Sequence, residues 1–201
     1  MSPTEVLMQE HRVIEQVLDC LEIMAQRAED ANEFDLESAN QAIDFFSNFA
    51  DRCHHGKEED CLFPLLEEKG FSRAQGPTGV MIHEHEEGRR HVHGMATAAS
   101  AVAAGSDASI SKFAAHAKAF TQLLREHIQK EDHCLFQMAD KVLSEQDQLQ
   151  LLKSFAHVEH DDLGPETHVK YLNVAIELTK RYGIEGKVKV PLTVANCCGQ
   201  H

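Results

Sequence analysis

The sequence lacks the marks of several protein classes. It has no tryptophan, two tyrosines and five prolines among 201 residues. No stretch approaches the roughly 20 apolar residues that a membrane-spanning helix requires. The N-terminal segment MSPTEVLMQEHRVIE carries acids where a signal peptide has a basic and then an apolar run. We therefore expect a cytoplasmic protein that has no membrane partner.

Positive charge is also scarce. Lysine and arginine total 19 against 33 acidic residues, which gives a formal net charge of -14. Such a chain repels phosphate backbones, so nucleic acid is excluded as a partner. Paired cysteine spacing is also absent from the predicted helices. In a reducing compartment, the four cysteines in these helices are expected to be buried thiols: Cys20, Cys53, Cys61 and Cys134.

Apolar residues recur at steps of three and four between sparse glycines and prolines, which is the period of α-helices. The pattern predicts helices over residues 3–30, 35–69, 78–104, 107–143, 144–160 and 165–182. We expect an all-α protein: an up-down-up-down four-helix bundle with two additional C-terminal helices and an extended tail. The expected parts are a bundle over residues 1–143 that carries a metal site, a helical extension over 144–184 and a tail over 185–201.

Histidine is abundant, with 14 residues, and an internal repeat accounts for part of the surplus. Residues 54–63, HHGKEEDCLF, align without gaps on residues 127–136, HIQKEDHCLF. The helices that precede these segments match too, because His11 precedes His54 by nearly the same interval as His85 precedes His127. The first two helices of the bundle are therefore echoed by the next two.

Each repeat contains a histidine and a glutamate four residues apart, His54 with Glu58 and His127 with Glu131. One helical turn places such a pair on the same face. An isolated pair is usually solvated, but these pairs interrupt apolar stripes and are predicted to point inward. The neighbouring His55 shares its helical face with polar residues and is predicted to face solvent.

Buried carboxylates and imidazoles would cost several kcal/mol per charge without compensation, and a metal removes that cost. A set of four imidazoles and two carboxylates suits iron, manganese, zinc or copper and argues against calcium and magnesium. Six ligands exceed what one tetrahedral zinc uses. Two ions bridged by both carboxylates use the whole set, and iron is preferred. The candidate ligands are His11, His54, Glu58, His85, His127 and Glu131.

The order His, His-x-x-x-Glu, His, His-x-x-x-Glu, with Leu-Phe-Pro after the first motif, resembles the hemerythrin-like HHE cation-binding domain family over about residues 4–142. The resemblance implies the same six ligands and two iron ions with an oxo or hydroxo bridge. Oxygen-carrying members have a further histidine one turn from the third-helix ligand. Met81 and Arg89 stand there, which argues against simple oxygen carriage. Those carriers also use an aspartate where Asp132 stands, but Glu131 shares the apolar face and is preferred.

Several residues have two interpretations. Cys61 and Cys134 could be redox-active, but apolar packing is preferred. His83 or His93 could supply a seventh ligand. A second metal site or an ordinary helix end could explain His157, His160, Asp161 and Asp162. The C-terminal residues could trap metal or sense oxidants, but a disordered tail is preferred: Cys197, Cys198 and His201.

Three functions fit this site. The first is a binder or sensor of oxygen, nitric oxide or peroxide in oxidative or nitrosative stress. The second is a di-iron enzyme that reduces peroxide or nitric oxide, or donates iron for cluster repair. The third is inert metal storage or a structural role. No general base or substrate pocket can be read from the sequence, so an organic substrate is not expected. A homodimer is possible, and the redox partner stays open.

Overall fold

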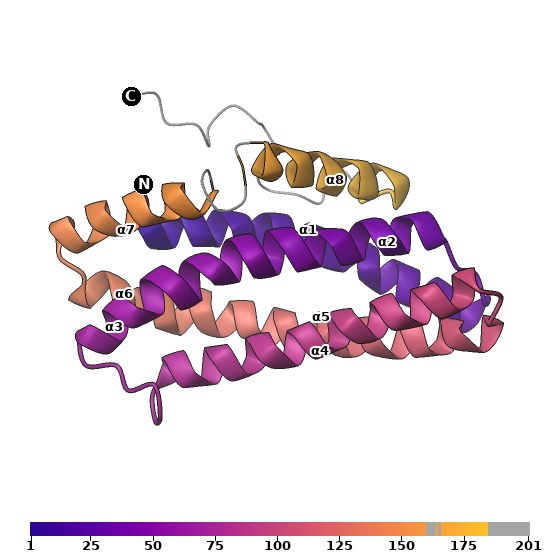
Figure 1. Cartoon of the computed structure of the whole chain (residues 1–201), viewed down its shortest axis with the longest axis horizontal. Helices are drawn as coiled ribbons and strands as arrows, with labels where there is room; N and C mark the ends of the chain where they lie inside the picture. The colour runs from indigo at the N-terminus through magenta and orange to yellow at the C-terminus, as the bar shows by residue number, and fades with distance from the viewer. Residues whose placement is uncertain (160–163, 165, 185–201) are drawn as a thin grey trace.

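The computed structural model describes residues 1–159, 164 and 166–184, and within these residues every regular element is a helix (Figure 1). The predicted all-α class is confirmed. The predicted tail over residues 185–201 lies outside the described residues, together with His160, Asp161 and Asp162. Among the helices that are described, none has the length and apolarity that a bilayer crossing requires.

The first rod of the bundle is α1, Pro3–Asp30. Ser2 caps it, since its hydroxyl accepts a hydrogen bond from the backbone N–H of Glu5 while the Glu5 carboxylate accepts one from the backbone N–H of Ser2 at 2.7 Å. This reciprocal capping box, with Pro3 in the first turn, explains why the helix begins there.

The second and fourth rods are not plain α-helices. The second comprises α2 (Leu36–Phe45), the π-helical segments η1 (Phe46–His55) and η2 (Glu58–Leu62), and α3 (Phe63–Glu68). The fourth comprises the 3₁₀ turn η3 (Asp107–Ser109), α5 (Ile110–Lys130), the π-helical η4 (Glu131–Leu135) and α6 (Phe136–Val142). Such wide turns are rare and occur often at functional sites. The sequence period did not predict them.

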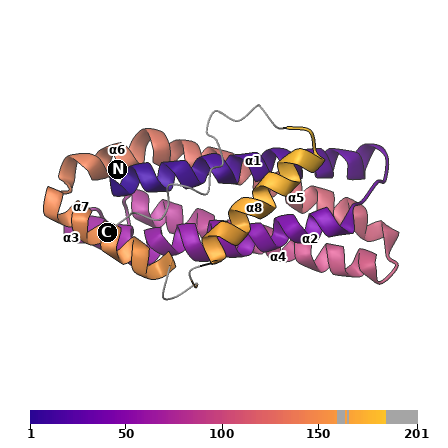
Figure 2. The same cartoon turned by 90° about the horizontal axis from the view of Figure 1, so that it is seen from above.

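The third rod is α4, Pro77–Ala103, and it runs antiparallel to its neighbours (Figures 1 and 2). Gly70 and Gly105 follow the second and third rods with φ of 100° and 93°, the left-handed conformation that ends helices at little cost for glycine. The four rods alternate in direction along the chain, so the predicted up-down-up-down topology is confirmed.

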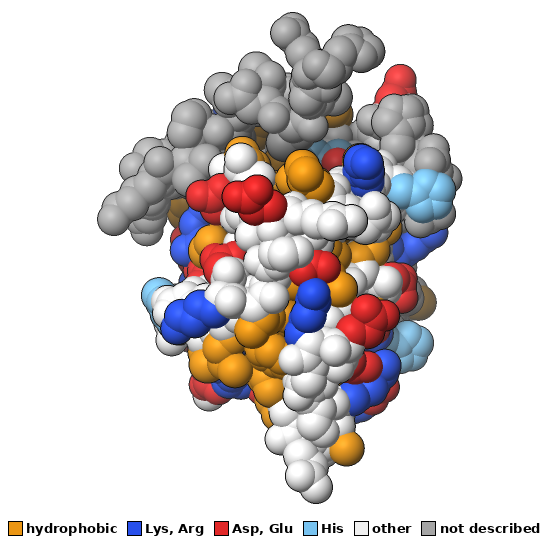
Figure 3. Space-filling model, turned by 90° about the vertical axis from the view of Figure 1, so that its left-hand side faces the viewer, with side chains coloured by type: hydrophobic (Ala, Val, Ile, Leu, Met, Phe, Trp, Pro, Cys, Tyr) orange, Lys and Arg blue, Asp and Glu red, His pale blue; other side chains and the backbone are white. Residues whose placement is uncertain are grey.

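Two further helices lie outside the bundle, as predicted (Figure 2). Helix α7, Glu145–His157, is capped by Ser144 and lies near η2 and α1. Helix α8, Thr167–Arg181, crosses α1 and α2. The division into separate domains stays a prediction. Figure 3 views the end of the bundle formed by α3, α6 and α7, where hydrophobic side chains are exposed among charged ones.

In the part of the chain that the structure describes, the hydrophobic interior forms two clusters. The larger contains Phe45, Phe46 and Phe120, and the smaller contains Leu62 and Phe136. Buried polar residues lie along the rods between these clusters. The fold thus places one polar layer inside an otherwise apolar bundle.

Candidate metal centre

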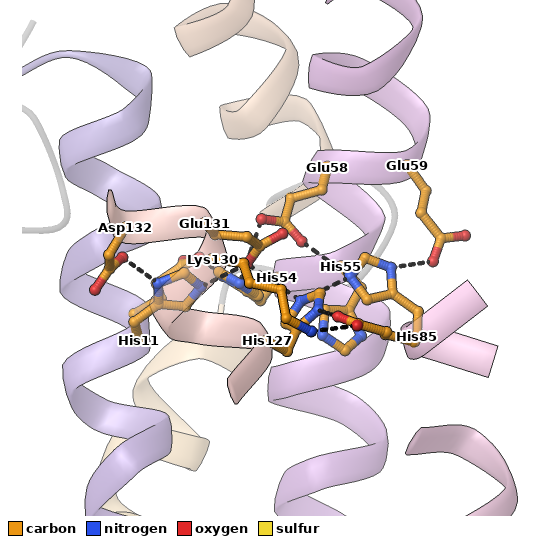
Figure 4. A network of polar contacts seen from close by, with 12 residues as sticks. His11, His54, His55, Glu58, Glu59, His85, His127, Lys130, Glu131 and Asp132 are labelled. Atoms are coloured by element: carbon orange, nitrogen blue, oxygen red, sulfur yellow. Dashed lines mark hydrogen bonds and ion pairs between the residues drawn. The ribbon is translucent and has the colours of Figure 1, made fainter. Parts of the chain in front are cut away.

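The structure brings the six predicted residues together in one buried layer (Figure 4). Each is at most 1% exposed. They come from all four rods, on α1, η1, η2, α4, α5 and η4, in the order His11, His54, Glu58, His85, His127 and Glu131.

Each carboxylate lies between two imidazoles from different halves of the repeat. The Oε2 atom of Glu131 is 3.2 Å from Nε2 of both His11 and His127. The oxygens of Glu58 lie 3.6 Å from Nε2 of His54 and 3.5 Å from Nε2 of His85. This is the arrangement expected of two carboxylates that bridge a pair of ions.

Two overlapping groups of donor atoms could each hold one ion, with the atoms of each group within 4.8 Å of one another. One group is His11, His54, Glu58 and Glu131, and the other is His55, Glu58, His85 and His127. Glu58 belongs to both groups, whereas Glu131 belongs to the first group only and reaches the second through its 3.2 Å contact with His127.

His55 corrects the sequence prediction. It was expected to face solvent, but it is only 5% exposed and its ring stacks on His85 with the centroids 3.8 Å apart. The cause is η1, because a π-helix puts more residues in each turn and successive side chains diverge less. Two neighbouring histidines therefore both face inward. Sequence reasoning based on the α-helical period could not have found this residue.

Every inward imidazole of the predicted set rests its outer nitrogen on a carboxylate, and the pairs cross between rods. The Nδ1 atom of His11 donates to Asp132 at 2.7 Å, and that of His85 donates to Glu59 at 2.6 Å (Figure 4). The other two pairs are His54 with Glu10 at 2.9 Å and His127 with Glu84 at 3.0 Å. Such pairing holds a proton on each Nδ1 and turns each Nε2 toward the layer, where it could bind a metal. In the metal-free layer, the Nε2 atoms of His85 and His127 lie 3.1 Å apart and form a hydrogen bond.

A layer of cations balances these outer carboxylates. Lys57 contacts Glu10 and Lys130 contacts Glu84, which explains why lysine recurs at the same place in both repeats. In the same way, Arg12 forms an ion pair with Asp132, the partner of His11, and Arg89 forms one with Glu59, the partner of His85. The repeated sequence therefore encodes ligands, their carboxylate partners and two of the balancing cations.

The position of Asp132 separates the two candidate carboxylates of the fourth rod. Asp132 accepts from the outer nitrogen of His11, whereas both oxygens of Glu131 are buried and have no hydrogen-bond partner. Asp132 therefore occupies the outer position and Glu131 the inner one, which supports the preference for Glu131.

The unpaired atoms test whether a metal fits. Buried polar atoms are normally hydrogen-bonded, and leaving them unpaired costs free energy. Here His11 Nε2, His54 Nε2 and all four oxygens of Glu58 and Glu131 have no hydrogen-bond partner, and they lie in the same layer. Imidazole nitrogens with carboxylate oxygens suit first-row transition metals. The residues present fit a pair of such ions.

The charges of the metal-free layer point the same way. Burial and the neighbouring Glu131 carboxylate raise the pKa of Glu58 well above its usual value. Burial also opposes the ionisation of Glu131, but the imidazoles of His127 and His11 outweigh it and hold the pKa of Glu131 well below the usual value. Burial lowers the pKa of His54 to about 3, so this imidazole is neutral and can act as a ligand.

Other sequence candidates lie away from the layer. His83 and His93 are exposed, so neither is placed to be a seventh ligand. The prediction of buried thiols holds for Cys20 and Cys53 but is wrong for Cys134, which is exposed, and Cys61 is only partly buried. The π-turns η2 and η4 rotate these two residues off the apolar stripe.

One more cluster lies beside the layer, where Glu10, Glu159 and His168 come together. The Lys57 ammonium contacts both glutamates, so a cation already occupies this place. The proposed second site on the fifth helix keeps only His157 within the described residues.

The fold and the site define a helical-bundle protein with a buried layer of histidines and glutamates suited to two metal ions. Residues 2–139 match the model of the hemerythrin HHE cation binding domain. This match spans more than half of the chain, which therefore belongs to that family.

The relatives leave the activity undefined. They include the uncharacterized proteins Rv1995 of Mycobacterium tuberculosis and Mb2018 of Mycobacterium bovis. Each is 23% identical over 180 residues, which is 90% of this chain and 70% of the relative. No solved structure matches the chain significantly.

Proposed function

We propose that this protein holds two iron ions in its bundle and binds a small oxidant or diatomic molecule there, as a binder or sensor in oxidative or nitrosative stress. The observation that carries the proposal is the convergence of six residues from four rods in one buried layer, where Nε2 of His11 and His54 and the oxygens of Glu58 and Glu131 have no hydrogen-bond partner. Membership of a cation-binding family supports it.

The proposed ligands divide by halves of the repeat. His11 and His54 would hold one ion, and His85 and His127 the other, with Glu58 and Glu131 between them. An iron pair with open positions supplies redox activity and a place for a small ligand. The oxo or hydroxo bridge that the family resemblance implies stays a prediction.

The surrounding residues keep the layer rigid and dry. Phe136 stacks on His11 with ring centroids 5.5 Å apart, and Phe63 stacks on His85 at 6.0 Å. The repeat places these two phenylalanines at equivalent positions, and both are 1% exposed. Together with the outer carboxylates, they limit the movement of the imidazoles, which is how a protein tunes a metal.

Two alternatives use the same centre. The protein would be an enzyme if the iron pair reduced peroxide or nitric oxide, or if it gave up iron for cluster repair. It would be a storage or structural protein if the metal were inert. Metal analysis of the purified protein, followed by optical spectra with azide, peroxide and nitric oxide, separates these functions. Zinc alone would eliminate the binder and the enzyme, and turnover of peroxide would favour the enzyme.

Variants make the test specific to the layer. His54→Ala and Glu131→Ala should each lose about one metal equivalent, because each removes a buried inner ligand. His83→Ala is the matched control, since His83 is exposed on α4. Equal metal loss from all three would overturn the assignment. A cytoplasmic location and a homodimer stay predictions, and the redox partner stays open.

A further inference from the structure

A cavity of about 240 Å³ opens beside one half of the metal layer, between the second rod and α4. Its walls are mainly apolar, and Phe120 of α5 is one of the lining residues. The apolar lining comes from Ile43, Phe46, Ala50, Gly88, Val92, Ala96 and Phe120. We call this cavity the groove.

One end of the groove is polar and adjoins the proposed metal ligands. His55 and His85 line it, with Asp51 and Arg89 beside them. The guanidinium of Arg89 donates to Asp51 at 2.8 Å and to Glu59 at 2.7 Å, so its charge is already balanced. Among the described residues that line the groove, Arg89 is the only lysine or arginine, so a bound anion would find no unpaired one there. The polar end therefore favours a neutral group.

The groove breaks the twofold repeat of the bundle. Relative to the matched histidines, Gly88 and His55 correspond to Ile14 and Ile128 in the other half. Both isoleucines are 1% exposed and belong to the larger hydrophobic cluster. A side chain at Gly88 would bring its first carbon within 3.4 Å of the Phe120 ring. The half that contains His85 therefore has open space where the other half is filled.

The size of the groove exceeds what a diatomic molecule needs. An engineered apolar cavity of about 150 Å³ binds benzene, so 240 Å³ corresponds by the same ratio to about ten non-hydrogen atoms. Ligand sites are commonly apolar pockets with a few convergent polar groups, and the groove has this form.

We propose that the groove binds small neutral organic hydroperoxides and the alcohols of the same shape, with the hydrocarbon against Val92 and Phe120 and the oxygen end beside His55 and His85. Only the choice of a hydroperoxide as the ligand rests on the proposed function. The apolar walls bury the hydrocarbon, and the His55 imidazole and the Asp51 carboxylate at the polar end offer hydrogen bonds to the hydroxyl or hydroperoxyl group. An organic ligand was not expected from the sequence, because residues of three rods form the groove.

The probe is cumyl alcohol, the unreactive alcohol that corresponds to cumene hydroperoxide, titrated by calorimetry into the purified, metal-containing protein. We expect binding in the millimolar range or tighter. Val92→Phe fills the groove and should weaken binding at least tenfold. Val80→Phe is the control, since Val80 lies on the same helix and is 49% exposed. Benzoate, an anion of similar size, should bind at least tenfold more weakly than the alcohol.

Ala96→Leu is a second filling variant in case Val92→Phe does not fold, and circular dichroism and metal content check both. No binding of cumyl alcohol by the wild type, or equal affinity in wild type and both filling variants, would overturn the proposal. Slower nitric oxide binding in the filling variants without binding of the alcohol would also overturn it, since the groove would then be only an entry path.

The two proposals can fail separately. Zinc-containing protein that binds cumyl alcohol, and loses this binding in Val92→Phe, would support the groove even if the centre never reacts with an oxidant. An iron protein that responds to nitric oxide or peroxide, but does not bind the alcohol, would keep the proposed function and reject the groove as an organic ligand site.

Discussion

Lys57 and Lys130 hold equivalent positions in the repeated segment, but the side chain of Lys57 is fully buried whereas that of Lys130 is 44% exposed. The difference comes from the C-terminal helices. Lys57 contacts Glu159 just after α7, and its ammonium lies 5.8 Å from the centroid of the Phe155 ring. Since Lys57 also contacts Glu10, the carboxylate partner of His54, it links the C-terminal extension to the metal layer.

Lys57→Met should destabilise the protein strongly, because it leaves the carboxylates of Glu10 and Glu159 without their shared cation. Removing one partner of a buried ion pair costs about 3–5 kcal/mol. The matched Lys130→Met breaks a partly exposed pair with Glu84 and should cost less than about 1 kcal/mol. Urea unfolding at equal metal content measures both. Similar losses from the two variants would show that the burial of Lys57 contributes nothing to stability.

Asp132→Asn and Glu131→Gln should differ in kind. Asp132 supports His11 from outside, so its variant should keep both metal equivalents and bind them about 10- to 100-fold more weakly. Glu131 has both oxygens in the layer, so its variant should lose at least one equivalent. Metal analysis with chelator competition distinguishes the two effects. Loss of a full equivalent from Asp132→Asn would make Asp132 a ligand.

Much of the fold was predictable because its signals are local. The Ser2 capping box and Gly70 and Gly105 mark helix ends through chemistry that lies within a few residues. The six converging residues were also predictable, since the repeat shows them twice. Their crossed carboxylate partners were not, because Glu10 and Glu59 reach histidines on other rods.

The errors have one main physical cause. A period of 3.6 residues placed His55 outside and Cys134 inside, and the π-turns in the second and fourth rods reverse both positions. No local signal in the sequence marks such a turn. The burial of Lys57 was hidden for another reason, since it depends on residues about 100 positions later in the chain.

Metal affinity should rise with pH. In the metal-free layer, burial raises the pKa of Glu58, and the carboxylates around His127, chiefly Glu131, raise the pKa of that imidazole to about 9 against the opposing effect of burial. His127 therefore carries a proton near neutral pH that a metal must displace, and the raised pKa of Glu58 acts in the same direction. The metal-free state binds more protons, so acidification favours it and releases metal.

Calorimetry in buffers of different ionisation enthalpy measures this exchange directly. Titration of ferrous iron or zinc into the metal-free protein at about pH 7 should release protons, because the pKa of His127 lies above that pH. Lowering the pH to about 5.5 should weaken binding further, because the metal must displace the His127 proton against a higher proton activity. Proton uptake on metal binding, or no exchange, would contradict the charge state derived for Glu58 and His127.

His55→Leu should weaken the binding of the ion beside His85 and leave the ion beside His11 unchanged. The change gives the second rod an aliphatic residue like Ile128 and removes the third imidazole from the group that contains His85. If His55 binds metal, the affinity for the ion beside His85 should fall about tenfold or more. A tenfold loss of affinity corresponds to about 1.4 kcal/mol. The ion beside His11 should keep its affinity, because His55 is absent from that group.

His83→Leu is the matched control, since it removes an exposed imidazole from the neighbouring rod and should leave both affinities unchanged. Chelator competition that resolves two classes of site in His55→Leu, but not in the control, would identify His55 as a ligand. Unchanged affinities in both variants would leave His55 with its stacking contact on His85 and its hydrogen bond to Asp51. In that case the difference between His55 and Ile128, which stand at equivalent positions of the repeat, shapes the groove and does not affect the coordination of the ions.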